Sequence, residues 1–418
     1  MKILIVGGGG REHAIAWKLA KSPKVEKMYC APGNAGIAEV AECVNIGVME
    51  FDKLVAFAKE HEIDLTVVAP DDPLAAGAVD AFEAAGLRAF GPRANAAILE
   101  GSKAFSKDLT KKYGIPTAAY ETFNDPEKAL AYLETAKMPI VLKADGLALG
   151  KGVLICKDLE EAKAGVRTLM MDKQFGSAGD EIVIEEFMTG REVSVLSFVD
   201  GKTIRIMTSA QDHKRAKDGD QGLNTGGMGT FSPSPFYTPQ VDAFCKEHIY
   251  QKTVDAMKAE GREFKGIIFF GLMLTADGPK VLEYNARFGD PETEVVLPRL
   301  KSDIVEIFSA VADGWELEHP LEWHDFSTVG VVLASKGYPG SYAKGAVIEG
   351  LDEVDGAVYH MGTASKEGRI VTAGGRVAIV VCAAPTLGEA LEKCNREVGK
   401  VRCDNLFHRT DIGRKAIK

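Results

Sequence analysis

One glycine-rich stretch of the sequence carries residue types that can bind phosphate. It runs Lys143-Ala144-Asp145-Gly146-Leu147-Ala148-Leu149-Gly150-Lys151-Gly152 and joins two short apolar runs. A Walker A loop would need Gly at Asp145 and Ser or Thr at Gly152, so the stretch is not that motif. In a turn between antiparallel strands, glycine N–H groups and lysine side chains can instead fold over phosphates. The sequence thus predicts a flexible phosphate-covering flap; a mobile hairpin with solvated lysines is the alternative.

A second pattern places a carboxylate and an amide on one predicted strand. Glu283 and Asn285 are two positions apart, so both side chains would point to one face, with Leu282 and Tyr284 on the other. Carboxylate and amide oxygens are hard ligands, which suit a Mg²⁺ ion that also bridges substrate phosphates. Arg287 follows two residues later. The pattern predicts a magnesium site, and an exposed strand face with an arginine–carboxylate pair is the alternative.

A third candidate lies near the amino terminus, where Gly7-Gly8-Gly9-Gly10-Arg11-Glu12 follows an apolar run and opens a predicted helix. Glycine backbone in front of a helix can bind an anion. The dinucleotide motif G-x-G-x-x-G fails here, because its third glycine position falls on Glu12. The next strand also lacks an acidic residue for a ribose, since it ends in Tyr29-Cys30-Ala31-Pro32. A phosphate-bearing substrate, a tight turn and a nicotinamide cofactor all remain open interpretations.

The elements that would position these motifs alternate between strand and helix over the first hundred residues. Strands are expected at 3–6, 27–30 and 65–68, and helices at 13–21, 51–60 and 74–85. The apolar runs are continuous, as is typical of parallel strands buried on both faces. This order predicts an α/β fold that begins with a small doubly wound parallel sheet.

The rest of the chain mixes strands and helices less regularly. Strands are expected at 140–142, 153–156, 182–186, 193–199, 329–334, 346–349 and 377–382, with a hairpin over 266–285. Helices are expected at 94–113, 158–171, 241–258, 302–312 and 386–397. Residues 212–239 are rich in Gly, Pro and polar side chains, which predicts one long loop. A loop of that length in a compact protein is usually functional or disordered.

Composition narrows the functional classes. The 418 residues are 46% hydrophobic and 26% charged, which is ordinary for a globular protein of several domains. The net charge of −10 argues against nucleic-acid binding, which relies on a basic surface. No apolar run reaches the length of a membrane span or a secretory signal. The seven cysteines contain no C-x-x-C pair, which predicts reduced thiols in a cytoplasmic protein and no zinc site.

Together these stretches resemble the ATP-grasp superfamily, and within it they closely resemble the glycinamide ribonucleotide synthetase family of purine biosynthesis. The similar blocks lie at 9–14, 31–36, 99–103, 143–147, 211–215, 224–229, 287–293 and 337–340. The resemblance covers the full length and implies an ATP-grasp fold in four parts. These are an N-terminal doubly wound domain (1–103), a small lobe with the flap (104–190), a large lobe with the metal site (191–325) and a small β-rich C-terminal domain (326–418).

The resemblance also implies an activity. Members of the family use ATP to phosphorylate the carboxylate of glycine, and the amine of 5-phosphoribosylamine then displaces the phosphate. The products are glycinamide ribonucleotide, ADP and phosphate, and the implied cofactors are ATP and Mg²⁺ or Mn²⁺. The amine of the substrate is itself the nucleophile, so no nucleophilic side chain is needed. A monomer or weak dimer in the cytoplasm is expected, with no nucleic-acid or membrane partner.

Specific residues take on roles through the same resemblance. Lys103 and Lys143 would contact the nucleotide phosphates from beneath, and Gly146, Gly150, Lys151 and Gly152 would close over them. Glu185 would accept from the adenine amino group, the backbone near Phe187 and Met188 would meet the ring edge, and Glu192 would hold the ribose. Glu283 and Asn285 would bind the metal, and Arg287 would orient the glycine carboxylate. Gly9, Gly10, Arg11, Asp212 and Asp290 would bind phosphoribosylamine. Arg287, Lys143 and Lys103 are the implied catalytic residues.

The sequence departs from the family pattern at several positions. Gly8 stands where Asn is common, Asp71 where Glu is usual and Leu149 where Ala is common. The first metal carboxylate of many ATP-grasp enzymes is also missing, because Gly271-Leu272-Met273 occupies its strand. The metal is therefore expected to depend largely on Glu283, Asn285 and the phosphates.

Other functions stay open on the sequence alone. A different ATP-grasp ligase, such as a carboxylase subunit acting on bicarbonate, would release ADP without glycine. A nicotinamide oxidoreductase built on the first domain would change the fluorescence of added NADH. A regulatory nucleotide-binding module would show no turnover.

Overall fold

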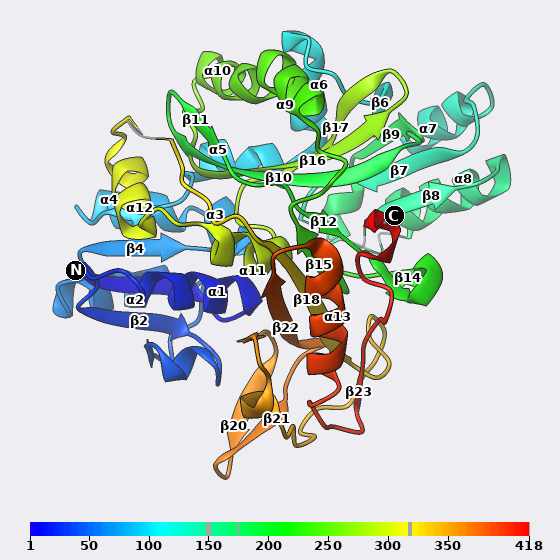
Figure 1. Cartoon of the computed structure of the whole chain (residues 1–418). Coiled ribbons are helices and arrows are strands. Elements are labelled where there is room, and N and C mark those ends of the chain that lie inside the picture. Colours follow the sequence, from blue (N-terminus) through cyan, green and yellow to red (C-terminus); the bar gives the residue numbers. More distant parts are fainter. Residues whose placement is uncertain (148–151, 173, 175, 317–319, 418) are drawn as a thin grey trace.

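The computed structural model describes residues 1–147, 152–172, 174, 176–316 and 320–417 (Figure 1). A parallel sheet lies to the left in the view of Figure 1, two antiparallel sheets lie along the top, and a further sheet built largely from the carboxyl-terminal segment lies below them. Within these residues no helix combines the length and the apolar character needed to cross a membrane.

The parallel sheet confirms the predicted doubly wound unit. Its strands, in spatial order, are β3 (Glu42–Cys43), β2 (Lys27–Pro32), β1 (Lys2–Gly7), β4 (Leu65–Val68) and β5 (Ala89–Phe90). The accompanying helices include α1 (Gly10–Leu19) and α2 (Phe51–Glu60). Residues 3–6 of β1 are fully buried, because their side chains enter a different hydrophobic cluster on each face of the sheet. The central strand β1 therefore delivers the glycine run to the carboxyl edge of the sheet.

Two predicted helices are each divided in the structure. The segment predicted at 74–85 forms α3 (Asp71–Ala75) and α4 (Ala78–Ala84), because Gly77 between them adopts a φ of +92°. The segment predicted at 94–113 forms α5 (Ala94–Gly101) and α6 (Lys103–Tyr113). Ser102 separates these two helices and caps α6 by accepting a hydrogen bond from the N–H of Phe105 at 3.0 Å.

A small antiparallel sheet follows. Its strands, in spatial order, are β6 (Tyr120–Phe123), β9 (Ile182–Glu186), β7 (Ile140–Ala144) and β8 (Val153–Cys156). Two helices, α7 (Pro126–Leu133) and α8 (Leu159–Val166), pack their apolar side chains against it. The helix predicted at 158–171 continues past α8 only as a π-helical segment, Arg167–Met171.

A larger antiparallel sheet carries the predicted carboxylate–amide pair. Its strands, in spatial order, are β11 (Ile204–Ile206), β10 (Arg191–Asp200), β16 (Lys265–Thr275) and β17 (Gly278–Asn285). The last two form the predicted hairpin. The predicted helix at 241–258 is α9 (Pro239–Cys245) and α10 (Gln251–Ala259) with a π-helical segment between them. The predicted helix at 302–312 is α12 (Ile304–Asp313).

The fourth main sheet corrects the prediction of one long loop at 212–239. Four strands lie in or at the edge of that segment: β12 (Gln211–Asp212), β13 (Arg215–Lys217), β14 (Gln221–Asn224) and β15 (Gly229–Ser232). Two of these join β18 (Ser327–Ser335), β22 (Arg376–Ala384) and β19 (Ala357–His360) in the order β12-β15-β18-β22-β19. The loop prediction was wrong because these strands are only two to four residues long, and because β15 pairs with β18, which is distant in sequence.

The remaining elements complete the carboxyl-terminal part. They are α11 (Glu292–Val296), the hairpin β20 (Thr363–Lys366) and β21 (Arg369–Thr372), α13 (Leu387–Val398) and β23 (Leu406–Phe407), which pairs with β18. The strand predicted at 346–349 is present only as two isolated bridges. One hydrophobic cluster contains Ile5 of β1, Phe308 of α12 and Ile379 of β22. The parallel sheet and the carboxyl-terminal sheet thus share a core.

Candidate functional site

A buried ion-pair cluster lies where the small sheet meets α6. Glu185 of β9 pairs with Lys143 of β7 and with Lys107 of α6, whose Nζ lies 2.5 Å from Glu185 Oε2. Burial works to raise the pKa of Glu185, but the two ammonium groups hold it below its usual value. Burial lowers the pKa of Lys107 to about 8. The cluster fixes Lys143, which also donates to the carbonyl of Leu282 at 3.2 Å and so links the two antiparallel sheets.

The capped start of α6 holds the amino-terminal base of the predicted flap. Lys103 is the first residue of α6, and its Nζ donates to the carbonyl of Gly146 at 2.8 Å. Asp145 accepts hydrogen bonds from the N–H of Ala104 at 2.9 Å and from the hydroxyl of Ser102 at 3.0 Å. At the other end of the flap, the carbonyl of Gly152 accepts from the N–H of Ala144 at 2.8 Å. Gly150 and Lys151 lie outside the described residues.

Glu283 lies in a strongly cationic environment on β17. Its Oε1 is 3.6 Å from Nζ of Lys214, and 35% of its side chain is exposed. Enclosure by the protein works to raise the pKa of Glu283, but Lys214, Lys143, Lys103 and Arg287 together hold it below its usual value. Glu283 therefore stays ionised across the physiological pH range. The exposed Glu192 of β10 lines the same small cavity, together with Lys214.

The bulge opposite Glu283 corrects one detail of the strand prediction. The register of β16 and β17 shifts between Gly271 and Leu272, so Leu282 is an extra residue on its strand. Leu282 consequently lines the cavity beside Glu283 instead of following Tyr284 into the core. A Cβ at Gly271 would lie 2.9 Å from Cγ of Glu283. Glycine at that position therefore makes room for the carboxylate across the hairpin.

The donors around Glu283 suit a hard divalent cation. Glu283 offers an ionised carboxylate and Asn285 an amide oxygen. The amide oxygen of Asn285 already accepts from NH2 of Arg287 at 3.0 Å, and its second lone pair can still bind a metal. Among the described residues there is no group of three or more His, Cys, Asp or Glu side chains able to hold a metal. The ion would thus need substrate phosphates as further ligands.

Arg287 is held by a carboxylate that sequence reasoning missed. Its NH2 lies 2.8 Å from Glu100 Oε1, and the carboxylate of Glu100 also accepts from the N–H of Ala286 at 2.8 Å. Nε of Arg287 is buried and has no hydrogen-bond partner in the described part of the chain. Burial raises the pKa of Glu100. The pair fixes the guanidinium beside Asn285, and 17% of the Arg287 side chain remains exposed.

The amino-terminal glycine turn meets the segment after β17. Arg11 donates from NH1 to the carbonyl of Phe288 at 3.1 Å, and its Nε lies 3.0 Å from Glu12. A Cβ at Gly9 would lie 3.8 Å from the carboxylate of Asp290. A Cβ at Gly10 would lie only 2.3 Å from Glu294 Oε1, so a residue with a side chain would clash there. The turn and Asp290 therefore form one surface.

The carboxyl-terminal sheet closes this surface with Arg376, another residue that the sequence analysis missed. NH1 of Arg376 donates to the carbonyls of Gly226 and Asp290 at 3.1 Å each, and it lies 2.9 Å from the carboxylate of Asp290. Asp212 of β12 lies beside the same glycine segment, since a Cβ at Gly227 would approach its Oδ1 to 2.7 Å. Burial and then Glu292 raise the pKa of Asp212.

The structure thus places the predicted residues in two groups. The first contains Lys103, Lys143, Gly146, Glu185, Glu192 and Glu283, and the second contains Gly9, Gly10, Arg11, Asp212 and Asp290. Asn285 and Arg287 connect them: Arg287 donates to the amide oxygen of Asn285 at 3.0 Å, and the carbonyl of Phe288 accepts from both Arg287 and Arg11, at 3.4 and 3.1 Å. Phe187 is exposed and Met188 is buried just after β9. Lys107, Glu100, Lys214 and Arg376 were missed because their partners are distant in sequence.

Comparisons with known proteins give one consistent family. The chain matches the models of the phosphoribosylglycinamide synthetase N domain over residues 1–100, the ATP-grasp (A) domain over 101–293 and the C domain over 328–415. A phosphoribosylamine–glycine ligase of Halalkalibacterium halodurans is 52% identical over 100% of this chain and 97% of its own.

Solved structures agree with the sequence relatives. The phosphoribosylamine–glycine ligase of Thermotoga maritima superposes with a TM-score of 0.88 at 34% identity, covering 99% of this chain and 100% of that one. The biotin carboxylase domain of the Hydrogenobacter thermophilus 2-oxoglutarate carboxylase, solved with MgADP and bicarbonate, gives a TM-score of 0.75 at 18% identity. It covers 97% of this chain and 91% of its own, and at this identity it shows the shared ATP-grasp fold alone.

Proposed function

The chain belongs to the phosphoribosylglycinamide synthetase family, and from that membership we propose how its cleft joins glycine to 5-phosphoribosylamine. The protein is an ATP-dependent ligase of purine biosynthesis that uses ATP with Mg²⁺ or Mn²⁺. Its products are glycinamide ribonucleotide, ADP and phosphate. The observation that best supports the location of the chemistry is the ionised Glu283 among Lys103, Lys143, Lys214 and Arg287.

The first group of residues binds the nucleotide in this proposal. Lys103 and Lys143 contact the phosphates, and the flap beginning at Gly146 and ending at Gly152 covers them. The adenine ring lies beside Glu185 with its edge against the backbone of Phe187 and Met188, and Glu192 holds the ribose. The exposed ring of Phe187 and the contact of Lys103 with Gly146 support this assignment. Gly150 and Lys151, which are also predicted to close over the phosphates, lie outside the described residues.

Glu283 and Asn285 hold the divalent cation. Bound there, the cation supplies positive charge against the phosphoryl group while that group is transferred. Lys103, Lys143 and Lys214 keep Glu283 ionised, so that it remains able to bind the cation. The amide of Asn285 is oriented by its hydrogen bond from Arg287, which couples the metal ligand to the acid-binding residue.

Arg287 orients the glycine carboxylate for attack on the terminal phosphoryl group. Its guanidinium is fixed by Glu100, and 17% of its side chain remains exposed to an incoming acid. A carboxylate oxygen of glycine attacks phosphorus, and the bond from phosphorus to the bridging oxygen of ADP breaks. Correct alignment of the two reactants supplies a large part of the rate of such a step.

Phosphoribosylamine binds in the second group of residues. The anion-binding turn Gly9–Arg11 and the surface formed by Asp212 and Asp290 receive it, and the N–H groups at the start of α1 favour its phosphate. Its amine attacks the acyl carbon of glycyl phosphate, the C–O bond to phosphate breaks, and the amine loses a proton to give the amide. No protein nucleophile takes part.

Release of ADP tests this function when candidate acids and amines are supplied separately. ATP with glycine and phosphoribosylamine, the latter generated in the assay from ribose 5-phosphate and ammonia, should give sustained release of ADP. Bicarbonate in place of glycine should give none. Release of ADP that depends on bicarbonate and not on glycine would contradict the proposal, as would turnover that does not require phosphoribosylamine.

The organisation of the chain completes the proposal. We assign 1–103 to the N-terminal domain, 104–190 and 191–325 to the two ATP-grasp lobes, and 326–418 to the C-terminal domain. The substrates are small molecules, and we further propose a monomer or weak dimer in the cytoplasm. The free state of all seven cysteines supports a reducing compartment.

A further inference from the structure

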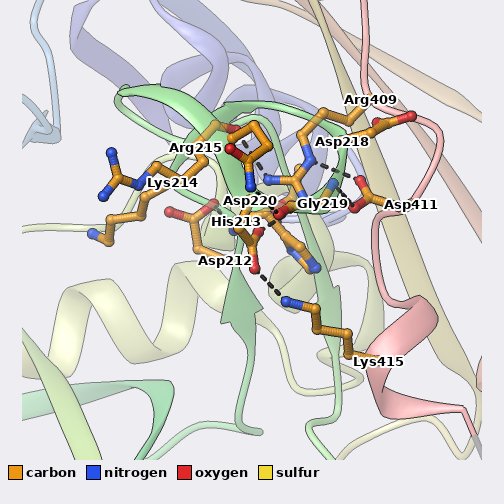
Figure 2. Close-up of polar contacts among 12 residues, drawn as sticks. Asp212, His213, Lys214, Arg215, Asp218, Gly219, Asp220, Arg409, Asp411 and Lys415 are labelled. Carbon is orange, nitrogen blue, oxygen red and sulfur yellow. Dashed lines mark hydrogen bonds and ion pairs between the residues drawn. The ribbon is translucent and has the colours of Figure 1, made fainter. Parts of the chain in front are cut away.

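The C-terminal tail (residues 408–417) is tied by an ionic network to the segment that runs from Asp212 at the end of β12 through β13 to Asp220, which we call the 212–220 loop (Figure 2). At its centre lies Arg409, whose side chain is only 1% exposed. Arg409 donates from Nε and NH2 to Asp411 at 2.8 and 2.9 Å, and from NH2 to Asp220 at 2.9 Å. Two carboxylates around one guanidinium fix its orientation.

Additional contacts extend the network along the loop. Thr410 donates from its N–H and its hydroxyl to Asp218, at 2.8 and 2.6 Å. The N–H of Gly219 donates to Asp411 at 2.8 Å, and Lys415 pairs with Asp220. The tail therefore holds the outer end of the 212–220 loop through both side chains and backbone.

The tail also contacts the two residues that flank Lys214. NH1 of Arg409 donates to the carbonyl of Arg215 at 3.0 Å. The N–H of Gly413 donates to Nε2 of His213 at 3.1 Å, which leaves Nδ1 of His213 to donate to the carbonyl of Gly229 at 3.2 Å. Burial, and then the charge of Arg409, lowers the pKa of His213 to about 4. The ring is consequently neutral at physiological pH and keeps both hydrogen bonds.

Lys214 itself points the other way, toward the small cavity that it lines with Glu192 and Glu283. Its side chain extends away from the Arg409 network in Figure 2, and its Nζ lies 3.6 Å from Glu283. Enclosure works to lower the pKa of Lys214, but Glu283, Asp212 and Glu192 raise it above its usual value. A permanently charged ammonium group thus lies beside the carboxylate to which we assign the metal. Its backbone is held on both sides from the tail.

We propose that Arg409 is a positioning residue, which through the backbone of His213 and Arg215 holds the ammonium group of Lys214 against Glu283. This inference rests on the proposed function, because it gives Lys214 a task at the nucleotide and metal site. Arg409 touches no reacting atom. It acts by fixing where the charge of Lys214 lies when the phosphoryl group is transferred.

A double-mutant cycle distinguishes a role of Arg409 in positioning Lys214 from a role in stabilising the fold alone. The variants are Arg409→Lys, Lys214→Met and the combination of both. Arg409→Lys keeps the charge and loses the planar fork that contacts Asp411, Asp220 and Arg215. Arg402→Lys is the matched control, because Arg402 also binds a carboxylate, Glu353, through two nitrogens and donates to a carbonyl, that of Lys400. Neither of these two partners of Arg402 belongs to the 212–220 loop.

Arg409→Lys should lower kcat by about tenfold and change the KM for ATP by less than about threefold, since misplacement affects the chemical step. In the Lys214→Met background the same substitution should cost less than about twofold in kcat, because the group that it positions is gone. Arg402→Lys should leave kcat unchanged in both backgrounds. An equal loss on Arg409→Lys with and without Lys214 would overturn the proposal.

Amide hydrogen exchange tests, without turnover, whether Arg409 holds the backbone on either side of Lys214. The N–H groups of Thr225 and Met228 donate to the carbonyls of Lys214 and His213 at 2.7 and 2.8 Å. Their exchange should accelerate in Arg409→Lys and stay at the wild-type rate in Arg402→Lys. Unchanged exchange in Arg409→Lys would contradict the proposal that Arg409 holds the backbone around Lys214. This outcome does not depend on which product the enzyme makes. Absence of glycine-dependent ADP release from the wild type would instead contradict the proposed function alone.

If Arg409→Lys does not fold, Thr410→Val provides the same test. It removes the hydroxyl donor to Asp218 and leaves the buried guanidinium in place. Its smaller loss in kcat should again disappear in the Lys214→Met background, and a loss that persists there would overturn the proposal.

Discussion

Glu283 gives the clearest prediction at the scale of single residues, because four cationic groups hold its carboxylate ionised beside an amide ligand. Glu283→Ala should lower kcat by about 10²–10³-fold, since the divalent cation loses a charged ligand where the phosphoryl group is transferred. The measurement is ADP release at saturating Mg²⁺. Glu322→Gln, which changes an exposed carboxylate paired with Lys301, is the control and should keep full activity. Activity of Glu283→Ala within about threefold of wild type would refute the metal assignment.

Arg287 permits a test that separates the acid from the nucleotide. Arg287→Lys keeps a positive charge but loses the planar guanidinium, whose NH2 contacts both Glu100 and Asn285. The apparent KM for glycine should rise by about tenfold or more, and calorimetry should give an ATP affinity close to wild type, because adenine and ribose are held by other residues. If ATP binding fails while the dependence on glycine is unchanged, Arg287 belongs to the nucleotide site.

The sequence identified the residue types of the site but not their partners. Glu283, Asn285 and Arg287 lie within five positions of one another, so strand periodicity alone placed them together. Glu100 of helix α5 is the partner of Arg287, which follows β17, and Arg376 of β22 reaches Asp290, which precedes α11. No periodicity in one segment can indicate such contacts, because they depend on how separate elements pack.

At the scale of elements, substitution by alanine should have opposite effects on stability at two glycines that lie in the first turns of helices. A Cβ at Gly10, the first residue of α1, would lie 2.3 Å from Glu294 Oε1 and 2.9 Å from Cγ of Met361. Gly10→Ala should therefore destabilise the protein by about 1–3 kcal/mol, as overpacking does. A Cβ at Gly388 of α13 would meet no described atom within 4 Å, so Gly388→Ala should stabilise by about 0.4–1 kcal/mol.

Urea denaturation of both glycine variants measures this difference. The midpoint for Gly10→Ala should fall below that of the wild type, and the midpoint for Gly388→Ala should rise. A wild-type midpoint for Gly10→Ala would show that Glu294 and Met361 can move aside, and that the turn is less tightly packed than the structure indicates.

Elements with a clear local sequence pattern were predicted well, whereas short strands whose pairing partner is distant in sequence were not. The helix at 51–60 and the strands at 65–68, 153–156 and 182–186 were predicted to the residue, because the strands contain short apolar runs and the apolar residues of the helix recur at helical spacing. The predicted loop at 212–239 contains short strands instead. Of these, β14 pairs with β13 inside the segment, whereas β15 pairs with β18, and nothing within the segment indicates that distant partner.

At the scale of the whole molecule, a histidine pair joins helix α1 of the amino-terminal part to strand β19 of the carboxyl-terminal sheet. Nδ1 of His13 in α1 accepts from the N–H of His360 at 2.8 Å. Burial lowers the pKa of His13 to about 3 and that of His360 to about 4, from 6.5. As the pH falls below 6.5, the unfolded chain binds protons on these rings while the folded protein does not. Stability should therefore decrease progressively from pH 6.5 downward.

His13→Asn tests this linkage, because its amide oxygen can take the place of Nδ1 and still accept from the N–H of His360, while the side chain no longer titrates. Between pH 6.5 and 5 the variant should lose about 2 kcal/mol less stability than the wild type, as expected when one buried histidine is removed. Thermal unfolding at a series of pH values provides the comparison. An identical acid dependence in the two proteins would exclude His13 as a source of the acid lability.

The most direct test of the central claim follows an oxygen atom from glycine. If glycyl phosphate forms and the amine attacks its acyl carbon, one carboxylate oxygen of glycine leaves with the phosphate. With glycine labelled by ¹⁸O in its carboxylate, and with ATP, Mg²⁺ and phosphoribosylamine, mass spectrometry should find one ¹⁸O in each phosphate released and one in the amide product. Phosphate without ¹⁸O, released together with ADP and the amide, would contradict the account.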